Sequence, residues 1–158
     1  MSRQLYLDCD GVLADFDKGA TAILGLPPTA YEDRHGAVHF WRKLAAAPDF
    51  YFGLPLLPDA MRLFDAVEHL DPIILTGMPR GNWAADQKRR WAAEYFPGTR
   101  IITTLAREKC AHCRAGDVLV DDQLRHAQLW RDAGGVFIQH RNAEATLRAL
   151  ADYFPLET

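Results

Sequence analysis

Short apolar runs alternate with longer amphipathic stretches along most of the chain. The run Leu5-Tyr6-Leu7 ends abruptly at the acidic segment Asp8-Cys9-Asp10, which predicts a buried strand. Further strands are predicted at 73–75, 101–103, 118–120 and 136–138, and helices at 60–70, 83–95 and 124–133. Asn142 is expected to be the N-cap of a last helix that ends near Tyr153.

Alternating strands and helices with short connections predict a parallel sheet covered on both faces. We therefore expect an α/β fold, a Rossmann-like three-layer sandwich in which ligands bind at the carboxyl ends of the strands. Residues 17–57 interrupt the alternation with several prolines and many aromatic residues, and we interpret them as a small helical cap inserted after the first strand. The core then comprises residues 1–16 and 58–158, and cap and core form one compact unit.

Composition limits the classes of partner. The chain has 158 residues, of which 49% are apolar and 25% charged, as in an ordinary globular domain. A net charge of -3 argues against a sequence-independent binder of long nucleic acid. The sequence has no apolar run of membrane-spanning length and no signal-like start, so we expect a cytoplasmic protein with no membrane partner. Three sparse cysteines fit a reducing compartment, and the pattern carries no signal for oligomeric state.

Polar side chains of a few particular kinds follow four of the predicted strands. They are Asp8 and Asp10 after the first, Thr76 after the second, Lys109 after the third and its connecting turn, and Asp121 and Asp122 after the fourth. The sheet brings these ends together, and carboxylates packed side by side repel one another unless a divalent cation holds them. Ligands that are all oxygen favour Mg²⁺.

Mg²⁺ beside a lysine and a hydroxyl suits the binding of a phosphoryl group, because the two cations neutralise its charge. One carboxylate can attack phosphorus, while a second aspartate two residues on protonates the leaving oxygen and later activates water. The strand-end residues therefore favour covalent phosphoryl chemistry.

The segment D-C-D-G-V-L-A-D-F at 8–16 resembles the first motif of the haloacid dehalogenase (HAD) superfamily phosphatases. The segment 74–77 is similar to the second motif, Lys109 to the third and the segment 117–122 to the fourth. Each motif alone is weak, but four of them in order between residues 5 and 122 form a specific set.

Within that superfamily the chain most resembles the 5′(3′)-deoxyribonucleotidases, whose first motif also runs D-x-D-G-V-L-A-D-F. The cap segment 32–41 is similar except for three inserted residues, 37–39, and so are the return to the core at 48–60 and the helix segment 88–96. The resemblance implies a Mg²⁺-dependent phosphomonoesterase that acts through an aspartyl-phosphate intermediate. Its substrate would be a small phosphorylated molecule, and the family resemblance favours a nucleoside monophosphate.

The resemblance also implies individual roles. Asp8 is the nucleophile and a Mg²⁺ ligand, Asp10 is the acid/base and a ligand through its backbone carbonyl, and Asp122 is the third protein ligand. Asp121 orients the metal shell. The remaining roles are the binding of phosphoryl oxygens and the lining of the substrate pocket; they fall to Thr76, Gly77 and Lys109 for the phosphoryl group and to Phe16, Phe40, Trp41 and Lys88 for the pocket. Gly77 offers only its backbone N–H where the family often has a second hydroxyl residue.

Other functions remain open from the sequence. The substrate is alternatively another small phosphate, such as a sugar or amino-acid phosphate. A second alternative is a non-catalytic HAD-like module that binds a ligand or a partner protein.

Several residues also have structural interpretations. The segment 88–90 reads as a solvated helix face, 50–52 as cap core, and Asp17 as the cap of the first inserted helix. The pattern Cys110-Ala-His112-Cys113 has the spacing of a zinc or redox pair, but the chain has no second pair to complete a zinc site. Cys9 is expected to be a small core residue.

Overall fold

The computed structural model describes residues 2–156 and has a five-stranded parallel sheet at its centre. The strands are β1 (Leu5–Leu7), β2 (Ile73–Gly77), β3 (Arg100–Thr104), β4 (Val118–Asp121) and β5 (Val136–Gln139). Their order across the sheet is β3-β2-β1-β4-β5, with β1 in the middle. The predicted parallel α/β sandwich is confirmed, and the chain enters the centre of the sheet with its first strand.

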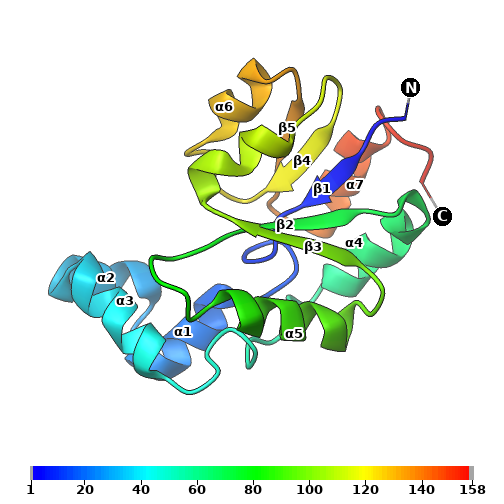
Figure 1. Cartoon of the computed structure of the whole chain (residues 1–158). Coiled ribbons are helices and arrows are strands. Elements are labelled where there is room, and N and C mark those ends of the chain that lie inside the picture. The colour runs from blue at the N-terminus through cyan, green and yellow to red at the C-terminus, as the bar shows by residue number, and fades with distance from the viewer. Residues whose placement is uncertain (1, 157–158) are drawn as a thin grey trace.

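Helices cover both faces of this sheet (Figure 1). One face carries α4 (Ala60–Val67), α5 (Ala85–Tyr95) and α7 (Ala143–Leu150), and the other carries α6 (Ala127–Asp132) and the 3₁₀ helix η2 (Ala106–His112). Successive side chains of a strand point to opposite faces. Leu5 and Leu7 therefore belong to the larger apolar cluster, whereas Tyr6 packs edge-on against Trp130 of α6 in the smaller one.

Three helices from the predicted insertion pack on one another beside the carboxyl ends of the strands (Figure 1). They are α1 (Phe16–Leu24), α2 (Pro28–His35) and α3 (Ala37–Ala46). Their buried residues, such as Tyr31 and Leu44, belong to the same apolar cluster as the sheet. The insertion is helical as expected, and the division of the chain at residues 17 and 57 stays a prediction.

The ends of several helices differ from the prediction. The carboxylate of Asp15 accepts from the backbone N–H of Lys18, so Asp15 caps α1 and the interpretation of Asp17 as the cap was wrong. Of the helix expected at 60–70, only residues 60–67 are α-helical, and the last turn is the 3₁₀ helix η1 (Glu68–Leu70). The helix expected at 124–133 begins only at Ala127. Asn142 caps α7 through a bond from Ala145, as predicted. No helix within residues 2–156 has both the length and the apolar character needed to cross a bilayer.

A buried aspartate fixes the amino end of the central strands. The two carboxylate oxygens of Asp117 accept from the backbone N–H groups of Gln4 and Arg114, at 3.0 and 2.9 Å. Its carbonyl accepts from Val136 N and from the indole of Trp130. Asp117 therefore joins β1, β4, β5 and α6 at the edge of the sheet opposite the predicted site.

We expect Asp117→Ala to lower the free energy of unfolding by about 2 kcal/mol or more, because two backbone N–H groups lose their acceptors. Asp117→Asn keeps one acceptor and is expected to cost roughly half as much. Urea denaturation of the three proteins measures this. A loss below about 0.5 kcal/mol for the alanine variant would show that these bonds do not hold the strands.

Candidate active site

The loop after β1 places two aspartates on different sides of the chain. The carbonyl of Cys9 accepts from the backbone N–H groups of Val12, Leu13 and Ala14, so the loop closes tightly on itself. Gly11 has φ +83°, and a Cβ there would overlap the carboxylate of Asp122. Glycine is thus required both by the backbone conformation and by the close approach of the β4 end. Cys9 is buried, as predicted.

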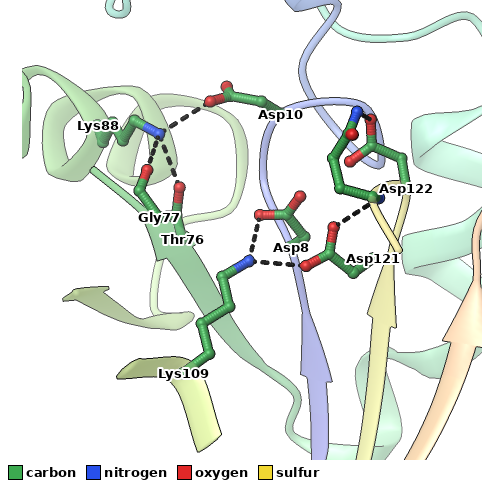
Figure 2. A network of polar contacts seen from close by, with 9 residues as sticks. Asp8, Asp10, Thr76, Gly77, Lys88, Lys109, Asp121 and Asp122 are labelled. Atoms are coloured by element: carbon green, nitrogen blue, oxygen red, sulfur yellow. Dashed lines mark hydrogen bonds and ion pairs between the residues drawn. The ribbon is translucent and has the colours of Figure 1, made fainter. Parts of the chain in front are cut away.

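Asp8 belongs to a buried charged cluster with residues from two other elements. Lys109 of η2 donates to Asp8 Oδ1 and to Asp121 Oδ2, both at 2.9 Å (Figure 2). All three side chains are buried. Asp122 follows directly and accepts from the side chain of Gln123. The structure therefore brings together four of the residues predicted from the strand ends.

Burial and mutual repulsion shift the ionisation of this cluster. Burial raises the pKa of Asp8 well above its usual range, and the charges of Asp121 and Asp122 add to this against Lys109. Burial and the charge of Asp121 raise the pKa of Asp122 to about 6. Burial also opposes the charge on Lys109, but its two carboxylate partners outweigh burial and raise its pKa. The cluster holds more negative charge than Lys109 alone balances.

The donor set fits a divalent cation. Asp8, Asp121 and Asp122 each offer a carboxylate oxygen, and the three oxygens lie within 4.8 Å of one another. No other set of three such side chains in the described part of the chain is this close. Oxygen ligands with excess negative charge suit a hard cation such as Mg²⁺. Asp121, predicted only to support the metal, is placed as well as the two predicted carboxylate ligands.

Asp10 belongs to a second network. Its carboxylate points away from Asp8 and toward Lys88 of α5 (Figure 2). The ammonium of Lys88 donates to Asp10 Oδ2 at 2.9 Å, to Thr76 Oγ1 at 2.8 Å and to the carbonyl of Gly77 at 2.9 Å. The site therefore has two lysines, and each holds one aspartate of the first motif.

One prediction about Lys88 was wrong. Its side chain is only 2% exposed, so it is not part of a solvated helix face. Lys88 is not among the residues that line the cavity, and its assignment to the substrate pocket stays a prediction. Lys88 lies three residues from the buried Trp91, on the inward face of α5, whereas Arg89 and Arg90 are exposed.

A cavity of about 690 Å³ lies between the strand ends and the cap helices. Asp8, Asp10, Gly77 and Lys109 line it from the sheet. The three aromatic residues predicted for the pocket also line it, namely Phe16, Phe40 and Trp41. Thr76 is fully buried and is not among the lining residues. The roles assigned to these residues stay predictions.

Several lining residues were missed by the sequence analysis. Tyr51 is buried, as expected for cap core, yet it also lines the cavity. Arg107, Arg125 and Arg141 line the cavity as well, and no residue within 2–156 forms an ion pair with them. Their position in the sequence could have indicated this, since each arginine follows shortly after the end of a strand.

The two neighbouring cysteines have different surroundings. Cys110 lines the cavity, whereas the thiol of Cys113 donates toward backbone oxygens, including that of Trp130. Burial raises the pKa of Cys113 to about 11, with Asp117 contributing. This thiol is therefore less readily ionised than an ordinary cysteine.

Comparison with known proteins identifies the fold. No family model and no curated protein matches the chain. Among solved structures, L-2-haloacid dehalogenase from Xanthobacter autotrophicus is 16% identical, with a TM-score of 0.61 over 98% of this chain and 85% of that chain. The same enzyme with chloropropionic acid covalently bound is 15% identical over the same shares, with a TM-score of 0.59. A hydrolase from Streptococcus pneumoniae TIGR4 is 13% identical, with a TM-score of 0.54 over 96% of this chain and all of that chain.

At these identities the likeness shows the fold. The chain has the HAD fold, so the superfamily resemblance read from its motifs agrees with its architecture. The narrower resemblance to the deoxyribonucleotidases stays a prediction.

We expect Mg²⁺ to raise the melting temperature by about 5 °C or more at saturation, because it binds only the folded cluster. Asp122→Asn is expected to melt higher than the wild type without metal, since one repelling charge is gone, and to gain little from Mg²⁺. Asp65→Asn, at an exposed position of α4, is the control. Equal Mg²⁺ shifts in the wild type and Asp122→Asn would contradict the assignment.

Proposed function

We propose that this chain, which has the fold of the haloacid dehalogenase superfamily, is a divalent-metal-dependent phosphomonoesterase for a small phosphorylated substrate, most closely a nucleoside monophosphate. The observation that carries this proposal is the meeting of Asp8, Asp10, Lys109 and the acidic cluster on one wall of an aromatic-lined cavity. The resemblance of the four motifs supports it independently.

The chain's own residues supply a balanced two-step reaction. An oxygen of Asp8 attacks phosphorus, the bond from phosphorus to the leaving oxygen breaks, and Asp10 donates a proton to that oxygen. Asp10 then takes a proton from a water molecule that attacks the phosphoryl group on Asp8, which releases phosphate, restores the carboxylate of Asp8 and returns Asp10 to its protonated form. Lys109, which lies 2.9 Å from Asp8, offsets the charge of the incoming phosphoryl oxygens.

Asp8, Asp121 and Asp122 would hold the cation, and the backbone carbonyl of Asp10 would add a ligand as the resemblance implies. The bound cation would supply neutralising charge for the phosphoryl group. Without it, a phosphate dianion would have to approach a cluster that already carries excess negative charge.

A dehalogenase shares this fold, so halide displacement has to be weighed against phosphoryl transfer. A halide leaves as a stable anion and requires neither a proton donor nor a cation that binds oxygen. An alkyl phosphomonoester such as a nucleotide needs a proton at its leaving oxygen and positive charge beside its phosphoryl oxygens. Asp10 and a cation held by the acidic cluster have the chemistry to provide them. We therefore favour phosphoryl transfer. The covalent complex of the dehalogenase fits covalent chemistry on this fold.

The cavity wall favours a nucleotide over other small phosphates. Phe16, Trp41 and Tyr51 line the cavity, and the Phe16 ring lies 6.2 Å from each of the other two rings, centroid to centroid. Stacking of a base on such a ring contributes about 1–3 kcal/mol, or roughly 10-fold to 100-fold in preference. A sugar phosphate or phosphoserine has no such ring. The exposed arginines at the strand ends add attraction for any anionic substrate.

Asp8→Asn is expected to lower phosphate release by at least about 1,000-fold, because the amide cannot attack phosphorus. Release of phosphate from p-nitrophenyl phosphate with Mg²⁺, and with EDTA instead, measures this. The control is Asp65→Asn, and circular dichroism verifies that the variants fold. Full activity in Asp8→Asn or in EDTA would refute the mechanism.

A panel of nucleoside monophosphates, sugar phosphates and phosphoserine is expected to show the highest kcat/KM for a nucleotide. Trp41→Ala should reduce that preference by about 10-fold while leaving p-nitrophenyl phosphate hydrolysis within about threefold, because stacking acts on the base. A preference for sugar or amino-acid phosphates would keep the chemistry and reject the nucleotide. Tight binding without turnover of any ester would favour the non-catalytic module.

A further inference from the structure

Asp10 is held by a single side chain. Its Oδ2 accepts from Lys88, and no other described residue bonds its carboxylate; Oδ1 is buried without a hydrogen-bond partner. Asp10 is also one of the residues that line the cavity, and its side chain is 24% exposed. Its orientation toward a substrate therefore depends on one ammonium group from α5, 78 residues along the chain.

All three N–H donors of the Lys88 ammonium are used within the protein. A lysine has three N–H donors, and those of Lys88 go to Asp10, Thr76 and Gly77 (Figure 2). The side chain is 2% exposed, and the face of the Tyr51 ring lies 4.4 Å from the nitrogen. Lys88 is therefore held in one place by bonds within the protein.

We propose that Lys88 is a positioning residue for proton transfer: it fixes the carboxylate of Asp10 relative to the end of β2, where Thr76 and Gly77 lie. This rests on the proposed function. The bonds tie the proton donor to the same strand end that is predicted to hold the phosphoryl group. Asp10 consequently keeps its place with respect to the leaving oxygen, which is attached to that phosphoryl group.

The chemistry of the leaving group separates this role from a purely structural one. An alkyl alkoxide is a poor leaving group and needs a proton from Asp10 as the bond to phosphorus breaks. A p-nitrophenolate leaves as a stable anion and needs none. Loss of a correctly placed proton donor should therefore slow an alkyl ester far more than the nitrophenyl ester. A loss of folding would slow both equally.

The experiment compares kcat/KM for 2′-deoxyuridine 5′-monophosphate and p-nitrophenyl phosphate in Lys88→Met, Lys88→Gln, Asp10→Asn and Lys88→Met/Asp10→Asn. This parameter reports the steps up to departure of the leaving group. The ratio of the two values is measured on one preparation, so it does not depend on the folded fraction. Arg89→Met removes a neighbouring exposed cation that donates to Thr103, its one side-chain partner within residues 2–156, and serves as the control.

We expect Lys88→Met to reduce kcat/KM for the alkyl ester by about 100-fold and for the nitrophenyl ester by less than about fivefold. Asp10→Asn should give the same pattern, and the double variant should be no slower than Asp10→Asn alone. Lys88→Gln, which keeps one donor, should recover part of the loss. Arg89→Met should leave the ratio unchanged.

Equal slowing of both esters in Lys88→Met would overturn the proposal, because it would place the effect on phosphate binding through Thr76 or on folding. Losses that multiply in the double variant would overturn it as well. If the wild type hydrolyses neither ester, the proposed function itself fails, which is a different result from equal slowing in the variants.

Discussion

The arrangement of the site depends on negative charge buried at the carboxyl edge of a parallel sheet. Asp8, Asp121 and Asp122 gather where β1 and β4 end, and one buried ammonium, that of Lys109, lies among them. Burial and repulsion raise the pKa of Asp8, so the cluster is costly without further positive charge. A bound divalent cation would lower that cost, which is why we propose the cluster as a site for a cation and a phosphoryl group together. Gly11 allows the approach, since any side chain there would meet Asp122.

Two lysines divide the first motif between two sides of the site. Lys109 binds Asp8 within the acidic cluster, while Lys88 binds Asp10 and turns its carboxylate toward the end of β2 (Figure 2). A nucleophile and a proton donor two residues apart would otherwise compete for the same cation. Separate partners keep the two carboxylates apart, as the proposed division of labour between a nucleophile and a proton donor requires. The cap helices complete the cavity with aromatic rings.

The sheet and the convergence of the motifs could be predicted because both depend on local pattern. Apolar runs such as 5–7 and 118–120 form the strands, and residues after parallel strands meet at one edge. The burial of Lys88 could not be read this way, since three consecutive cations on a helix normally face water. Only the three-residue spacing to Trp91 indicated that Lys88 faces inward. That spacing does not reveal which hydrogen-bond acceptors Lys88 meets in the interior. The N-cap of α1 is Asp15 and not Asp17, because the helix begins at Phe16.

Quenching the wild-type protein in acid during turnover of p-nitrophenyl phosphate and mapping its peptides by mass spectrometry tests the central claim most directly. An acyl phosphate survives acid long enough to be located. The account predicts one added phosphoryl group on the peptide that contains Asp8, and none on that peptide from Asp8→Asn treated in the same way. A phosphoryl group on another residue, or rapid turnover with no modified peptide, would contradict it.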